Sequence, residues 1–508
     1  MSTQAKRAMI NTMAQHIRAI ISVCITLYST RLVLDALGQS DYGIYSLVAG
    51  VIAMLGFLTN AMVVTTQRYI SYYFGKGISS QVTLIFKNSM FLHIVMGLLV
   101  AVVLILFREP IINGLEIAPE RHEVALHVYV MAIAMLFVSI ITSPFKALFI
   151  ARENIVYISI IEVCNAILKL IIALMLVCTE NDKLYFYASL MITLQVMDLL
   201  AYALYALIRF PECSIHFQKG DINRDSLKQL TGFAGWTIYS AGCIIGRDQG
   251  MQVLLNLSFG TVINSAYGIA MQVSGQIKFL AQAVLNAMNP QIVKAEGRNE
   301  RQEMLRLSEV TSKFATMLLM MIAIPLIIEI PGIMEWWLKE VPENSVLFCR
   351  AILISAIVDQ STIGLGSANQ AIGKIRNYSL IVNTTKVLSL PIIWFCLHSH
   401  YPLLVVMTCY VSMEALCAII RLPMLKYTAG LSIMHFINSV HKPLALPAIS
   451  LIVTGLLFTH FVQMPCRFLV SIPVSIIVSA IVIWYATFTK SEQDFAMGII
   501  NKFLHKNK

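Results

Sequence analysis

The chain has 508 residues, of which 58% are hydrophobic and only 13% charged, and its mean hydropathy is +0.75. Soluble domains carry about 25% charged residues, so this composition excludes a molecule whose whole surface faces water. At about 20 residues per membrane-spanning helix, the apolar residues suffice for about 14 spans. The sequence therefore predicts an all-α polytopic membrane protein.

Basic residues outnumber acidic ones by 37 to 27, which gives a net charge of +10. In a membrane protein this excess indicates basic loops on the cytoplasmic side rather than a nucleic-acid partner. The ten cysteines include no CxxC pair, and most fall within apolar runs. We therefore expect free thiols and no disulfide framework.

Apolar stretches of roughly 17 to 27 residues are separated by short polar segments along the whole chain. We expect each stretch to be a helix, because a helix satisfies its backbone hydrogen bonds without water. The predicted spans are, in chain order, Ile10 to Leu32, Ile44 to Val64, Ser89 to Phe107, Val124 to Pro144, Ile155 to Cys178, Leu184 to Ile208, Phe233 to Leu257, Val262 to Met288, Phe314 to Ile330, Val346 to Leu365, Leu380 to Leu397, Leu403 to Ile420, Leu444 to Phe461 and Phe468 to Phe488.

The segments between these spans alternate in charge. If the N-terminus is cytoplasmic, the inner segments hold 24 Lys and Arg residues and the outer loops hold only 5. Cytoplasmic loops of membrane proteins carry such an excess. The alternation predicts an even number of spans, with both termini in the cytoplasm.

The two halves of the chain match at an offset of 222 residues: Gly38 corresponds to Gly260, and Gly75 corresponds to Gly297. Two lobes of six spans in the same orientation, related by an axis along the membrane normal, account for such a repeat. The predicted parts are an N-terminal six-helix lobe at 1–220, a C-terminal six-helix lobe at 221–430, and two additional helices with a basic tail at 431–508.

Six basic residues lie inside the predicted spans, away from the ends. A charge at the bilayer centre costs about 2.5–3.5 kcal/mol, so each is expected to face protein or a water-filled cavity. They come from five spans in both lobes, which favours a central cavity that binds an anionic group. The six residues are Arg18, Arg31, Lys169, Arg247, Lys278 and Lys386.

Acidic residues inside the spans either couple transport to a cation or pair with basic side chains. Glu162 and Lys169 lie two turns apart on one helix face, so a structural pair and a role in transport are both open. Asp248 follows Arg247 directly and neutralises it only in part, because consecutive side chains point about 100° apart. Glu414 is a further membrane carboxylate. The candidates for ion coupling are Glu162, Asp198, Asp248 and Asp359.

No catalytic or metal-binding motif is present: the sequence lacks HExxH, GxSxG and a glycine-rich phosphate loop. The outer loops reach at most about 16 residues, which leaves little room for the active site of a polysaccharide polymerase or ligase. We therefore expect no enzymatic activity, no cofactor and no metal.

Several short motifs resemble a known family. TRLVLDALG at 30–38, DYGIY at 41–45 and TQRYIS at 66–71 are similar to the start of polysaccharide-export proteins of the multidrug/oligosaccharidyl-lipid/polysaccharide exporter superfamily. These are the Wzx-type flippases of O-antigen and capsule repeat units. ALFIARE at 147–153 and its second-lobe counterpart ANQAIGK at 368–374 extend the resemblance over the twelve-span core.

The resemblance implies a bacterial inner-membrane flippase that moves an undecaprenyl-pyrophosphate-linked oligosaccharide to the periplasmic leaflet by alternating access. The resemblance also implies membrane lipids, a polysaccharide polymerase and chain-length machinery as further partners. The six basic residues would then accept the pyrophosphate, for which guanidinium and ammonium groups are strong partners.

The alternative is a cation-coupled multidrug antiporter of the same superfamily. Such a transporter needs carboxylates that face its cavity, and Asp198, Asp248 and Asp359 could supply them. The predicted first span argues against this alternative, because it carries two arginines and no acidic residue.

Overall fold

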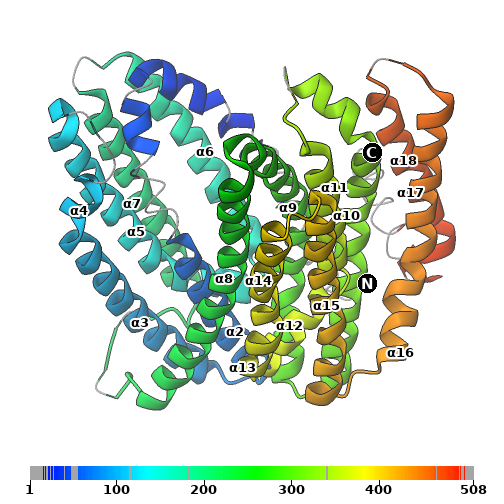
Figure 1. Ribbon diagram of the computed structural model, residues 1–508. Coiled ribbons are helices and arrows are strands. Elements are labelled where there is room, and N and C mark those ends of the chain that lie inside the picture. Colours follow the sequence, from blue (N-terminus) through cyan, green and yellow to red (C-terminus); the bar gives the residue numbers. More distant parts are fainter. Residues whose placement is uncertain are drawn as a thin grey trace, which may run out of the picture. The chain divides into compact units, whose positions relative to one another are not determined.

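The computed structural model describes residues 15, 18, 21–22, 24–26, 28–38, 41–46, 48, 55–113, 117, 119–179, 182–214, 216–218, 220–338, 341–464, 466–490, 492–493 and 497. Within these residues the regular structure is helical throughout (Figure 1). The described residues form two compact units. We call residues 7–241 with 293–299 the N-terminal unit, and residues 242–292 with 300–508 the C-terminal unit.

Helix α5 is the centre of the N-terminal unit. It packs against α2, α3 and α7, and its residues Tyr129, Ala132 and Ile140 are buried in the core between these helices. The elements of this unit are α2 (Gly56–Gly75), α3 (Ser79–Leu106), α4 (Arg108–Asn113), a 3₁₀ turn (Pro119–Arg121), α5 (His122–Ala151), α6 (Ile155–Val177) and α7 (Lys183–Arg209).

Two long helices, α8 (Arg224–Phe259) and α9 (Thr261–Gly297), have residues in both units. In the C-terminal unit α11 packs against α10 and α15, while α17 and α18 pack against α10. The remaining helices are α10 (Arg301–Trp337), α11 (Ser345–Gln360), α12 (Ile363–Ile372), α13 (Ile375–Tyr378), α14 (Thr384–His398), α15 (Leu403–Ala429), α16 (Ile433–Phe436), α17 (Lys442–Phe461) and α18 (Phe468–Val482), with π-helical turns at Ser379–Asn383, Ile437–His441 and Ile483–Thr487.

Nine helices in the described part of the chain are long and apolar enough to cross a membrane, and the bent pair α11 and α12 makes a tenth. Helices α8 and α9 match the predicted seventh and eighth spans, but they are more polar than these nine. The predicted first span lies only partly within the described residues, which are helical there up to Gly38. The prediction of an all-α polytopic membrane protein is confirmed.

Several predicted spans differ from the structure in their bounds or their continuity. The span Val346 to Leu365 is not one helix, because α11 and α12 meet at a break with a bend of 44°. The third span begins at Ser79 rather than Ser89, and the added turns carry Lys87 and Asn88. Hydropathy marks the part of a helix that suits hydrocarbon, whereas the helix itself continues into the polar region.

The glycine pairs of the internal repeat have matching roles. Gly38 and Gly260 both have positive φ, at +77° and +79°, a conformation that glycine adopts without steric cost. Gly75 is the last residue of α2 and Gly297 is the last residue of α9, and these two helix ends are in close contact. A Cβ on Gly75 would lie 2.1 Å from a backbone oxygen of α9, and one on Gly297 would lie 2.2 Å from a backbone oxygen of α2. The ends of α2 and α9 therefore cross at these two glycines.

The connection between α7 and α8 is held against α3. Lys87 Nζ lies 2.7 Å from Asp221 Oδ2. Asn88 donates from Nδ2 to the backbone oxygen of Asp221 at 2.7 Å, and its Oδ1 accepts from the N–H of Asn223 at 2.9 Å. The hydrogen bonds from Lys87 and from the N–H of Gln218 hold the pKa of Asp221 below its usual range. The connection is thus a fixed part of the N-terminal unit.

Candidate functional site

The six basic residues predicted to line a cavity fall into two groups. Three of them form close ion pairs with carboxylates, and the other three have exposed side chains. The ion-paired residues are Arg18, Arg247 and Lys386. The exposed residues are Arg31, Lys169 and Lys278.

In the N-terminal unit Arg18 pairs with Glu162 of α6. The sequence leaves open an ion pair between Glu162 and Lys169, but in the structure Glu162 forms its ion pair with Arg18. Residues seven apart on a helix are separated by roughly 10 Å along its axis, which is too far for a direct ion pair. Arg18 has no acidic partner nearby in its own helix, so its partner comes from another helix.

Asp198 of α7 is buried and bound by two neighbours. Asn165 Nδ2 donates to Asp198 Oδ1 at 2.9 Å, and Lys146 Nζ lies 3.4 Å from Oδ2. Lys169 acts on Asp198 electrostatically, while its own side chain is exposed. Sequence reasoning missed Lys146, because the predicted fourth span ended at Pro144 whereas α5 continues through this lysine.

A buried network of three basic and three acidic residues lies in the C-terminal unit. It joins side chains from four helices that are distant in sequence. Its members are Arg247 and Asp248 of α8, Asp359 of α11, Lys386 of α14, and Glu414 and Arg421 of α15.

Arg247 has two acidic partners in this network. Its Nε donates to Asp248 Oδ1 at 2.9 Å, and its Nη1 donates to Glu414 Oε2. The guanidinium also lies over the ring of Tyr410, 5.0 Å from the centroid. Asp248 was expected to neutralise Arg247 only in part, and Glu414 of α15 supplies the second carboxylate.

Lys386 lies between two carboxylates. Its Nζ is 3.0 Å from Asp359 Oδ1 and 2.5 Å from Glu414 Oε1. Glu414 therefore joins Lys386 to Arg247, and its side chain is only 3% exposed. Arg247 and Lys386, two of the three predicted cations of this unit, are therefore held in ion pairs.

Arg421 holds the break between α11 and α12. Its Nη2 lies 2.6 Å from Asp359 Oδ1, and its Nη1 donates to the backbone oxygen of Asp359 at 3.0 Å and to Thr362 Oγ1 at 3.1 Å. A cation at a helix C-terminus satisfies carbonyls that lack helical partners. Sequence reasoning missed Arg421, because the predicted twelfth span ended at Ile420 whereas α15 continues to Ala429.

The network is neutral as a whole, with three positive and three negative charges. Burying one ion costs several kcal/mol, so such a network is stable only when every member is paired. An incoming anion could bind Arg247 or Lys386 only by displacing Glu414 or Asp359. A substrate anion can therefore bind more readily to the exposed basic side chains than to those of the network.

The three exposed cations have different surroundings. The Arg31 side chain is 79% exposed, and its Nε lies 4.0 Å from Asp35 Oδ2 one turn further along. The first helix thus does contain an acidic residue, which the predicted end at Leu32 left out. Lys169 lies near the middle of α6, and Lys278 lies near the middle of α9, close enough to Asp359 to act on it electrostatically.

The last two helices are fixed to α10 by buried charges. Arg467 Nε lies 3.0 Å from Glu329 Oε1, which also accepts from Ser471 Oγ at 2.8 Å. Beyond α18, Glu492 contacts Lys313 Nζ at 3.0 Å. The additional helices are therefore an integral part of the C-terminal unit.

No family model matches this sequence, and comparison with curated proteins finds no relative. Solved structures do match in fold. A MATE transporter in the bent conformation aligns with a TM-score of 0.74 at 14% identity, over 84% of this chain and 97% of that one. An outward-facing multidrug resistance MATE family transporter of the MOP superfamily aligns with a TM-score of 0.71 at 13% identity, over 84% and 96%.

A MOP superfamily transporter from Pyrococcus furiosus also aligns, with a TM-score of 0.72 at 13% identity, over 84% of this chain and 96% of that one. Its binding pocket is described as having a reverse polarity that suggests a different function. At these identities the likeness establishes the fold alone. The chain has the fold of the MATE transporters of the MOP superfamily.

Proposed function

We propose that this chain is a transporter that moves a lipid-linked oligosaccharide with a diphosphate headgroup across the bacterial inner membrane by alternating access. The fold shared with MATE transporters supports transport, and the motifs at 30–71 support the polysaccharide-export class. Both termini would then be cytoplasmic, and a polysaccharide polymerase and chain-length machinery would be the protein partners.

The distribution of paired and exposed charges inside the helices is the observation that supports an anionic cargo. Every membrane carboxylate that the sequence singled out lies within 3.4 Å of a basic side chain, namely Glu162, Asp198, Asp248, Asp359 and Glu414. Lys169 and Lys278 are exposed near the middle of their helices. Placing a charged ammonium group at the centre of the bilayer costs about 2.5–3.5 kcal/mol of free energy, so we infer that both lysines face water. The accessible charge is therefore positive.

A lipid diphosphate suits these groups. Lysine ammonium groups bind phosphate oxygens through charge-assisted hydrogen bonds, while a polyprenyl tail can stay in lipid. Gln276 and Gln282 are exposed on α9 on either side of Lys278, and their amides can donate to and accept from sugar hydroxyls.

Ion coupling would use the paired carboxylates. A proton taken up by Asp359 would leave the buried network with an excess positive charge, and so would free Lys386 or Arg421 to interact with an anion. Proton uptake and anion binding would then favour each other, as thermodynamic linkage requires.

Two lysine substitutions test the proposal. In a strain that lacks its repeat-unit flippase but carries this chain, Lys169→Gln and Lys278→Gln should each reduce surface polysaccharide at normal expression, and the double variant should abolish it. Lys228→Gln is the matched control, because Lys228 is exposed near the start of α8. Full complementation by the double variant would refute the role of these lysines.

A cation-coupled multidrug antiporter is the second candidate, and the likeness to a multidrug resistance MATE transporter favours it directly. Asp35 beside Arg31 also removes the argument that the first helix lacks acidic residues. This function would require Asp198, Asp248 or Asp359 to leave its basic partner and bind a cation. Energy-dependent efflux of a lipophilic cation that is lost in Asp198→Asn would establish it.

A further inference from the structure

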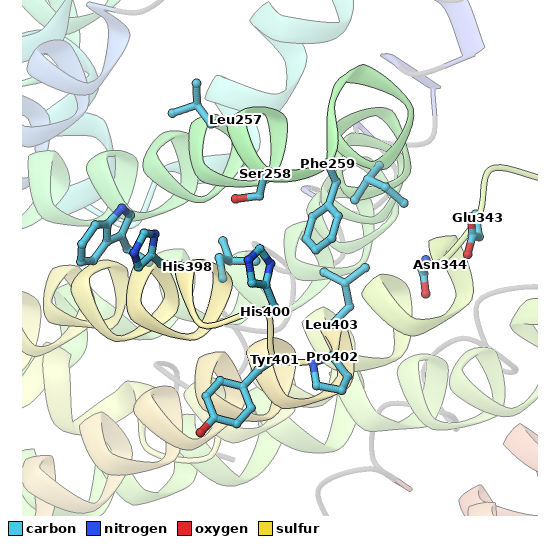
Figure 2. A pocket seen from close by; sticks show the side chains of 13 residues that line it. Leu257, Ser258, Phe259, Glu343, Asn344, His398, His400, Tyr401, Pro402 and Leu403 are labelled. Carbon is cyan, nitrogen blue, oxygen red and sulfur yellow. The ribbon is translucent and has the colours of Figure 1, made fainter.

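A pocket of about 940 Å³ lies in the C-terminal unit, where α8 and α14 end and α15 begins (Figure 2). We call it the outer pocket, because the charge asymmetry of the connecting segments places these helix ends outside. Sites for small molecules have volumes of about 300–1,000 Å³. The outer pocket is therefore large enough for a short oligosaccharide.

The outer pocket has different chemistry at its two ends. His398 lies at one end, Glu343 and Asn344 lie at the other, and Phe259 and His400 lie between them (Figure 2). The amide, carboxylate and imidazole groups supply both donors and acceptors. A ligand that spans the pocket would meet hydrogen-bonding groups at both ends and an aromatic ring between them.

Trp394 and His398 form a ring platform on one face of α14. Their centroids are 5.3 Å apart and their planes are inclined by 7°, because residues four apart on a helix are neighbours. Such a platform offers an apolar ring surface with a polar edge. The C–H face of a pyranose can pack on the rings while its hydroxyl groups reach the polar edge.

The outer pocket does not suit phosphate. None of the 13 described side chains that line it is lysine or arginine, and Glu343 would repel an anion. The proposed diphosphate chemistry at Lys169 and Lys278 is therefore absent here. What fits is a ligand rich in hydroxyl groups without phosphate.

We propose that the outer pocket binds the sugar part of the cargo on the outer side. This inference rests on the proposed function, and it adds a sugar subsite to that function. Trp394 and His398 stack against a sugar ring, and Glu343 with Asn344 binds hydroxyl groups at the opposite end.

Titration with the free sugar tests the subsite. The full chain in detergent is titrated with the lipid-free, phosphate-free repeat unit obtained by hydrolysis of the surface polysaccharide of its source strain, and binding is followed by ligand-observed NMR. Binding should be saturable and should weaken about tenfold in Trp394→Leu. It should weaken several-fold in Glu343→Ala, and it should be unchanged in Trp337→Leu, an exposed tryptophan at the end of α10 that does not line the pocket.

The opposite results are equally clear. Equal affinity in wild type, Trp394→Leu and Glu343→Ala, or no saturable binding to wild type, would overturn the subsite. Complementation by the Lys169 and Lys278 variants decides separately on the proposed function, because neither lysine lines the outer pocket. A lipophilic cation that binds in the pocket while the sugar does not would overturn the subsite and support the antiporter.

Discussion

At the scale of single residues, the buried charges are structural and the exposed ones are available for binding. Arg247 and Lys386 each contact two carboxylates, and Glu414 is shared between them. Composition and spacing located both cations within the membrane. They could not show their neutralisation, because Glu414 and Asp359 are far away in sequence. Ion pairing between helices depends on the packing of the unit, and a one-dimensional pattern does not contain it.

Glu414→Gln tests the cooperativity of this network. The substitution should destabilise the protein by about 3–5 kcal/mol, because it leaves the buried network with one uncompensated positive charge. Thermal unfolding in detergent measures the effect. Glu303→Gln is the control, since Glu303 pairs with Arg306 on the exposed side of α10. It should change stability by at most about 1 kcal/mol. Equal losses in both variants would contradict a cooperative buried network.

At the scale of secondary structure elements, the sequence predicts most helices but neither their full lengths nor their breaks. The apolar pattern places Lys146 and Arg421 in connecting segments, yet both lie in helices that continue beyond the apolar run. The predicted tenth span also runs across the break between α11 and α12. The polar run DQST at 359–362 coincides with this break, but the contacts of Arg421 with Asp359 and Thr362 that support it come from α15.

The crossing of α2 and α9 depends on Gly297. A methyl group there would lie 2.2 Å from a backbone oxygen of α2, so Gly297→Ala should force the helix ends apart and cost about 1–3 kcal/mol. Gly268→Ala on the same helix is the matched control, because a Cβ there has no atom within 4 Å. It should be neutral or slightly stabilising. Thermal unfolding of both variants measures these effects. If Gly297→Ala is as stable as wild type, the tight crossing is disproved.

The connection between α7 and α8 should loosen in acid. Lys87 and the N–H of Gln218 lower the pKa of Asp221, so the stabilisation is complete above the ordinary pKa of about 4 and is lost as pH falls through the lowered value. Asp221→Asn should reproduce this loss at neutral pH. Hydrogen exchange of residues 216–223 should then be faster in the variant at pH 7, and unchanged exchange would rule out this contact as the anchor.

At the scale of the whole molecule, the low content of charged residues predicts a membrane protein, and the length of the apolar runs predicts that its spans are helices. The internal repeat pointed to paired glycines, and both pairs have matching geometry in the structure. The predicted lobe boundaries and the cytoplasmic position of the termini stay predictions. The role of the last two helices could not be read from sequence, because their attachment to α10 depends on Arg467 meeting Glu329 across 138 residues.

The sign of the transported charge is the central claim, and a transport assay tests it most directly. The full chain is reconstituted into proteoliposomes, and movement of a lipid-linked oligosaccharide diphosphate between leaflets is compared with transport of a lipophilic cation. We predict that the chain moves the diphosphate lipid and that Lys169→Gln with Lys278→Gln abolishes this movement. Transport of the cation, with the diphosphate lipid left in its original leaflet, would contradict the account.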